Sequence, residues 1–180
     1  MTNGVEPWNV DELPMDPAVI RNARPGQLFL LPTRLDENGY GLYQDDFAGF
    51  PKTVRSSGIE LYFSHNAENR RYLGEYSATD LAINIGMAIA GNLSTDLVKY
   101  AYWITKFRAR QILGANVDDA TVDATTAELE IARFEAYGDH RVIEGLKYRG
   151  PIGAIETVLN GHLATVNQSE EADDRDGEGN

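Results

Sequence analysis

The sequence predicts an α+β protein, in which two β-hairpins form a mostly antiparallel sheet that packs on one long central helix and a short C-terminal helix. Hydrophobic residues make up 42% of the 180 residues, which is enough for a core of ordinary size. Short stretches in which apolar and polar residues alternate predict the strands. A long apolar stretch between about residues 78 and 113 predicts the central helix.

The first 24 residues predict an extended arm, because prolines interrupt them and no apolar period is visible. One helical turn is expected after Pro17. A short strand is expected over residues 27–31, where Pro32 ends it. Residues 33–57 are rich in glycine and other turn residues, so they predict a loop region with one short strand around residues 40–43.

The first hairpin is predicted over residues 59–64 and 70–76. Ile59, Leu61 and Phe63 alternate with Glu60 and Tyr62, which is the period of a half-buried strand. The polar residues between the two stretches are typical of a turn. We therefore expect these two strands to pair in the antiparallel sense.

The second hairpin is predicted over residues 128–137 and 141–149, with a tight turn at Gly138-Asp139. The apolar period shifts by one residue within the first of these strands. A bulge near Ala132 would restore the period, because a bulge inserts one extra residue into one strand of a pair.

The central helix is predicted from about residue 78 to residue 113, and Ser77 has the position of its N-cap. The alternative is a break at Gly91-Asn92, followed by a second helix that begins at Ser94 or Thr95. Residues 115–126 are acidic and rich in alanine and threonine, and they predict a linker.

A last helix is predicted to begin at Pro151 and to end at Gly161. Its apolar face consists of Ile152, Ile155, Val158 and Leu159. The predicted organisation is an extended arm (residues 1–24), a single α+β domain (residues 25–166) and an acidic tail (residues 167–180). Because the tail has six acids and no large apolar residue, we expect it to be disordered.

The composition restricts the classes of partner. The chain has 28 acidic and 16 basic residues, and its net charge of −12 repels phosphate backbones, so we expect no nucleic-acid binding. It contains no cysteine, which excludes disulfides, thiolate metal sites and a cysteine nucleophile. The N-terminal residues carry acids and no apolar segment of the signal-peptide kind, so the sequence predicts a cytoplasmic protein.

A row of small residues is predicted along the central helix. Its members are Ala82, Gly86, Ala90 and Ser94, spaced four residues apart. On a helix this spacing leaves a shallow groove that another backbone can approach closely. The groove is expected to take either the protein's own sheet or terminal helix, or a second copy of the chain in a homo-oligomer.

A membrane-active protein is a further alternative, because residues 81–104 approach the length that spans a bilayer. However, polar residues interrupt the segment, among them Asn84, Asn92, Asp96 and Lys99. Asp and Lys each cost about 2.5–3.5 kcal/mol at the centre of a bilayer, so insertion is disfavoured. The sequence therefore predicts that this segment packs against protein.

The turn of the first hairpin is the candidate ligand site. It is predicted to place His65, Glu68, Arg70, Arg71 and Glu75 together, where the arginines could bind a carboxylate or a phosphate. A solvated hairpin end is the competing interpretation. No nucleophile, phosphate-loop or dinucleotide motif is present in the sequence, and we expect no metal and no cofactor.

These observations favour a non-enzymatic cytoplasmic binding or regulatory module that binds a protein partner or itself. A small enzyme or ligand-binding protein that uses the His65 turn is the first alternative. The membrane-active protein is the second.

Overall fold

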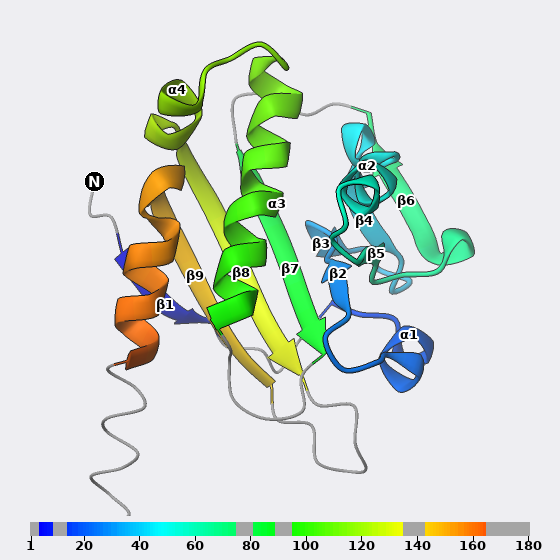
Figure 1. The fold of residues 1–180 in the computed structure, drawn as a ribbon. Helices are drawn as coiled ribbons and strands as arrows, with labels where there is room; N and C mark the ends of the chain where they lie inside the picture. The colour runs from blue at the N-terminus through cyan, green and yellow to red at the C-terminus, as the bar shows by residue number, and fades with distance from the viewer. Residues whose placement is uncertain (1–3, 9–13, 75–80, 89–94, 135–142, 165–180) are drawn as a thin grey trace, which may run out of the picture.

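A computed structural model describes residues 4–8, 14–74, 81–88, 95–134 and 143–164 of the chain (Figure 1). The strands are β1 (Gly4–Trp8), β2 (Leu28–Leu30), β3 (Arg34–Leu35), β4 (Gly41–Gln44), β5 (Leu61–Phe63), β6 (Arg70–Leu73), β7 (Ala82–Ala88), β8 (Thr126–Phe134) and β9 (Ile143–Pro151). The helices are α1 (Pro17–Asn22), α2 (Phe50–Ser56), α3 (Thr95–Leu113) and α4 (Asp119–Ala124), with 3-10 turns η1 (Asp45–Phe47), η2 (Ala67–Asn69) and η3 (Ile152–Ala154). A further helix occupies residues 155–164.

The α+β class predicted from the sequence is confirmed. Within the described residues, one sheet has six strands in the order β1-β9-β8-β7-β2-β5, and a second sheet has the order β3-β4-β6. Helix α3 and the 155–164 helix lie on the same face of the larger sheet (Figure 1). The main hydrophobic core lies between this face and the two helices, and the smaller cluster on the other face is covered in part by α1.

Residues 82–88 form the inner strand β7, where the sequence predicted a helix. Strand β7 pairs in parallel with β8 and antiparallel with β2. Ile83 and Ile85 are buried in the main core, and Gly86 and Ala88 are buried on the opposite face. A strand covered on both faces is apolar at most positions, and Asn84 is the one polar residue of β7, so its sequence lacks the regular alternation of apolar and polar residues that identifies a half-buried strand. The long helix is therefore wrong, and so is the first helix of the alternative with a break. Helix α3 begins at Thr95, where that alternative placed its second helix, and Gly91-Asn92 and the predicted N-cap Ser77 lie outside the described residues.

The row of small residues does not lie on a helix. Ala82 and Gly86 belong to β7, while Ala90 and Ser94 lie outside the described residues. A Cβ atom added to Gly86 would lie 3.2 Å from Cδ2 of Leu31, so the glycine already allows a close contact inside the protein. Self-association stays a prediction, but it needs a surface other than this one.

The first predicted hairpin is also wrong, because its two strands belong to different sheets. Strand β5 pairs in parallel with β2 in the larger sheet, and β6 pairs in parallel with β4 in the smaller one. Turn η2 lies between them in sequence, so the chain passes from one sheet to the other there. Local alternation predicts a strand but does not identify its partner.

The antiparallel pairing of the second hairpin is confirmed, while its predicted turn at Gly138-Asp139 lies outside the described residues. Strands β8 and β9 pair antiparallel in unbroken register from Thr126 opposite Pro151 to Phe134 opposite Ile143, so the bulge near Ala132 is wrong. The shift in the apolar period has another cause, because β8 is buried on both faces near its end. Ala132 and Phe134 pack in the cluster on the far face, which also contains Met15, Phe29, Leu31 and Ala88.

The structure corrects three shorter predictions. In the predicted extended arm, β1 pairs with β9, and α1 supplies the expected helical turn after Pro17. The predicted linker contains α4, whose N-cap Asp118 accepts a hydrogen bond from the Thr121 amide at 2.7 Å. The last helix continues past Gly161 to residue 164. The predicted acidic tail lies outside the described residues.

Candidate binding surface along helix α3

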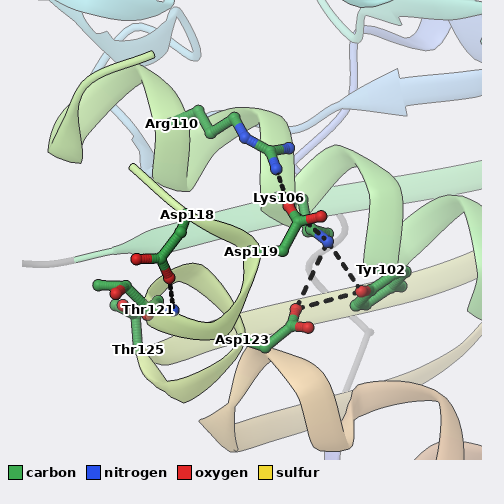
Figure 2. A network of polar contacts seen from close by, with 8 residues as sticks. All are labelled: Tyr102, Lys106, Arg110, Asp118, Asp119, Thr121, Asp123 and Thr125. Atoms are coloured by element: carbon green, nitrogen blue, oxygen red, sulfur yellow. Dashed lines mark hydrogen bonds and ion pairs between the residues drawn. The ribbon is translucent and has the colours of Figure 1, made fainter. Parts of the chain in front are cut away.

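Helix α3 presents different side chains to three neighbours, because a helix turns by 100° at each residue. Its side toward the sheet is buried and consists of Leu97, Val98, Ala101, Ile104 and Ala109. A second side contacts α4 (Figure 2). A third side lies beside α2 and the turn that follows it. The contacts of the first two sides fix the rotation of α3, and this rotation determines which side chains the third side presents to solvent.

Lys106 connects α3 to α4 (Figure 2). Its side chain is only 6% exposed, and Nζ lies 3.4 Å from the Asp119 carboxylate and 3.6 Å from that of Asp123. Nζ also donates a hydrogen bond to the Tyr102 hydroxyl at 3.1 Å, and this hydroxyl donates to Asp123 at 3.1 Å. Arg110 on the next turn of α3 pairs with Asp119.

Burial alone would lower the pKa of Lys106, but the Tyr102 hydroxyl and the two carboxylates outweigh burial, so the pKa is raised. Lys106 therefore stays protonated and is not available as a nucleophile. We assign it a structural role, in which it holds α3 in the rotation that turns Trp103 away from the sheet. Its ammonium group also lies 5.5 Å from the centre of the Trp103 ring.

Arg108 connects α3 to the smaller sheet. Its side chain is 1% exposed, and its guanidinium donates hydrogen bonds to Asp46 and Gln111, both at 2.8 Å, and to Gln44. The guanidinium also lies 4.0 Å over the ring of Phe47. Because a guanidinium is always charged, the Asp46 carboxylate supplies the compensating charge at this buried position.

Two adjoining hollows lie between α3 and α2, and together they form the α2–α3 groove. One is lined by Asp46, Gly49, Phe50, Thr53, Phe107, Arg110, Gln111 and Ala115, and the other by Ser57, Gly58, Ile59, Lys99, Tyr100, Trp103 and Phe107. Their volumes are about 370 and 430 Å³, which leaves room for large side chains in each. The hollows are neighbours along α3, because Phe107 lines both of them.

The groove is mostly apolar, and one of its two hollows is lined by an exposed aromatic side chain, Trp103. Trp103 is 41% exposed, although tryptophan is among the most costly side chains to leave in water. Lys99, Trp103 and Phe107 are spaced four residues apart, so they form one stripe on α3. Within this stripe Lys99 and Trp103 are exposed, and Phe107 is partly buried against the main core.

The structure brings only His65 and Arg70 of the predicted ligand residues within electrostatic range of each other, and it exposes Glu68 and Arg71. His65 is 4% exposed, and its Nδ1 lies 3.1 Å from Ser64 Oγ and 3.3 Å from the Tyr43 hydroxyl. The guanidinium of Arg70 lies over Phe63 at 4.0 Å, and that of Arg71 over Tyr40 at 4.1 Å. Glu68 is exposed, and Glu75 lies outside the described residues.

The His65 cluster joins the two sheets. The Tyr43 hydroxyl lies 2.9 Å from Ser64 Oγ, so β4 of the smaller sheet contacts the end of β5 in the larger one. Gly41 makes room for the imidazole, since a Cβ atom there would lie 2.8 Å from His65 Nδ1. Asp16 accepts a hydrogen bond from Asn69 at 2.9 Å at the same junction. We read this cluster as a structural contact, because its polar atoms bind one another.

Burial lowers the pKa of His65 below its usual value of 6.5, Asp16 opposes this shift and Arg70 adds to it. The unfolded chain therefore takes up a proton near pH 6.5 while the folded chain does not. We expect the free energy of unfolding to be highest above pH 6.5 and to fall as the pH is lowered from 7 to 5. Urea unfolding at several pH values measures this slope, and His65→Gln should reduce it. An unchanged slope in the variant would contradict the prediction.

The α2–α3 groove was not predicted from the sequence, although Phe50 and Trp103 were among the aromatic residues that could line a pocket. The helix predicted from about residue 78 includes Lys99, Trp103 and Phe107, but its row of small residues was taken as the interaction surface. The four-residue spacing of Lys99, Trp103 and Phe107 was visible in the sequence. Residues 33–57 were predicted to form a loop region, so helix α2 and its contribution to the groove were missed.

Comparisons of the chain with protein-family models, with curated proteins and with solved structures find no match. Among the described residues, no helix has the length and apolar character needed to cross a bilayer. In the same residues, no group of three or more His, Asp or Glu side chains is placed to hold a metal ion.

Proposed function

We propose that this chain is a non-enzymatic binding module of the cytoplasm, and that its binding surface is the α2–α3 groove. The observation that carries the proposal is the pair of apolar hollows that share Phe107, one of which is lined by the half-exposed Trp103. Tryptophan, tyrosine and arginine contribute most to protein interfaces, and this groove presents one of each in Trp103, Tyr100 and Arg110. The cytoplasmic location is supported by the lack of cysteine in the sequence.

The rigidity of the groove also supports the proposal. The Lys106 contacts fix α3 on one side, and the Arg108 contacts fix it on the other. Binding to a surface that is already ordered loses less conformational entropy than binding to a mobile one. The contacts of the buried Lys106 and Arg108 side chains therefore hold α3 in the position that forms the groove.

Selection of peptides on the purified protein tests the proposal. A displayed library of short helical peptides, with varied apolar positions, is panned against the wild-type chain. We expect enriched peptides that bind the wild type and fail to bind Trp103→Ala. Tyr72→Ala is the matched control, since Tyr72 is 40% exposed on β6, outside the groove. Enriched peptides that bind Trp103→Ala as well as the wild type, or a failure of any peptide to enrich, would contradict the proposal.

The alternatives from the sequence have weaker support. A ligand site at the His65 turn stays a prediction, and the burial of His65 and the stacking of Arg70 on Phe63 and of Arg71 on Tyr40 speak against it. For the membrane-active alternative, the described part of residues 81–104 consists of β7 and the start of α3, and much of it is buried in the core. Self-association through the α2–α3 groove is a variant of the present proposal, in which the partner is a second copy of the chain. Light scattering distinguishes it, because the measured mass would then rise with protein concentration.

A further inference from the structure

We infer that the partner of the α2–α3 groove is an acidic amphipathic helix, a segment with apolar side chains on one face and carboxylates beside them. This inference rests on the proposed binding function and specifies the chemistry of the partner. It is drawn from the charges at the two ends of the groove and from the type of element that forms its walls.

The charged side chains that line the groove sum to +1 in an otherwise acidic protein. Its three charged side chains are Lys99, Arg110 and Asp46, and the one carboxylate among them is bound to the buried Arg108. The chain as a whole has a net charge of −12, so a lining with two cations and one carboxylate differs in sign from the rest of the protein. Complementary charge at the rim of an interface favours encounter with an acidic partner and disfavours a basic one.

The two cations stand at opposite ends of the apolar stripe. Lys99 precedes Trp103 by one turn of α3, and Arg110 follows Phe107 by one turn. Arg110 also contacts Asp119, but a guanidinium has five N–H donors and can bind a second carboxylate. A partner that fills both hollows would therefore place acidic groups near both of its ends.

The walls of the groove favour a helical partner over an extended one. The lining residues belong to η1, α2, α3 and the turns after the two helices, and none of them belongs to a strand. An extended peptide relies on a free sheet edge to satisfy its backbone groups. A helix satisfies its own backbone and can bind through side chains spaced three, four and seven residues apart.

Two peptide libraries test the inference directly. Both have the same varied apolar face, and their other positions are Glu, Gln or Ser in one library and Lys, Gln or Ser in the other. We expect the acidic library alone to yield peptides that require Trp103. Lys99→Glu should weaken a selected acidic peptide on the order of fivefold, as expected for an exposed charge pair, and added salt should reduce the difference.

Arg21→Glu is the matched control for Lys99→Glu, because it changes the net charge equally on exposed α1, which packs against the other face of the sheet. Arg110→Gln tests the second cation of the groove in the same way, because glutamine is polar but carries no charge. Circular dichroism verifies that this variant is folded. If basic peptides bind through Trp103 as tightly as acidic ones, the inference about the partner is wrong while the binding function stands. If neither library yields a Trp103-dependent peptide, both are wrong.

Discussion

Ile104→Ala should lower the free energy of unfolding by about 3 kcal/mol, because it removes a fully buried side chain and leaves a cavity in the main core. Its neighbour Trp103 faces solvent, so Trp103→Ala should lower the same quantity by less than about 1 kcal/mol. Urea unfolding measures both, if the transition is two-state. The comparison tests which side of α3 faces the sheet.

The two residues are adjacent on the same helix, so a change in helix propensity alone affects them similarly. Only their rotation about the axis of α3 distinguishes them. Equal losses of stability in the two variants, or a larger loss from Trp103→Ala, would mean that α3 is rotated relative to this structure. The α2–α3 groove would then be part of the core.

Asp46→Ala is expected to cost about 2 kcal/mol, because it leaves the buried guanidinium of Arg108 without its compensating charge. The cost lies below that of a fully buried pair, since the Asp46 side chain is 49% exposed and water can take its place. In an Arg108→Met background the same substitution should have little effect, because no charge is left to compensate.

A double-mutant cycle over Asp46 and Arg108 isolates their interaction from the other effects of each substitution. Urea unfolding of the wild type, the two single variants and the double variant supplies the four free energies. A cost for Asp46→Ala that is the same in both backgrounds would contradict the ion pair as a source of stability. It would also remove one of the two contacts that hold α3 in place.

The sequence was sufficient to predict the fold class and the elements whose partners are close in sequence. The β8–β9 hairpin was predicted because two strands close in sequence pair with each other. Strand β7 was missed because it is covered on both faces, and such strands share their continuous apolar composition with buried helices. The pairing of β5 with β2 was missed because a parallel partner lies far away in sequence, beyond any local pattern.

The candidate surface was harder to predict than the fold. Polar residues such as His65 and Arg71 drew attention in the sequence, but the structure uses His65 inside a junction between the sheets and places Arg71 on Tyr40. The α2–α3 groove depends on tertiary structure, because α2 and α3 are brought together by the β5 and β7 pairings between them. Trp103 could be assigned to the surface only once the rotation of α3 was known.

The affinity of a selected acidic peptide for the wild type and for Trp103→Ala, measured by fluorescence anisotropy, tests the α2–α3 groove most directly. Urea unfolding of the same samples shows that the variant is folded. We predict a loss of affinity of at least about thirtyfold, the effect of removing a residue at the centre of an interface, with little change in stability. Equal affinity for the two proteins would contradict the assignment of this surface as the binding site.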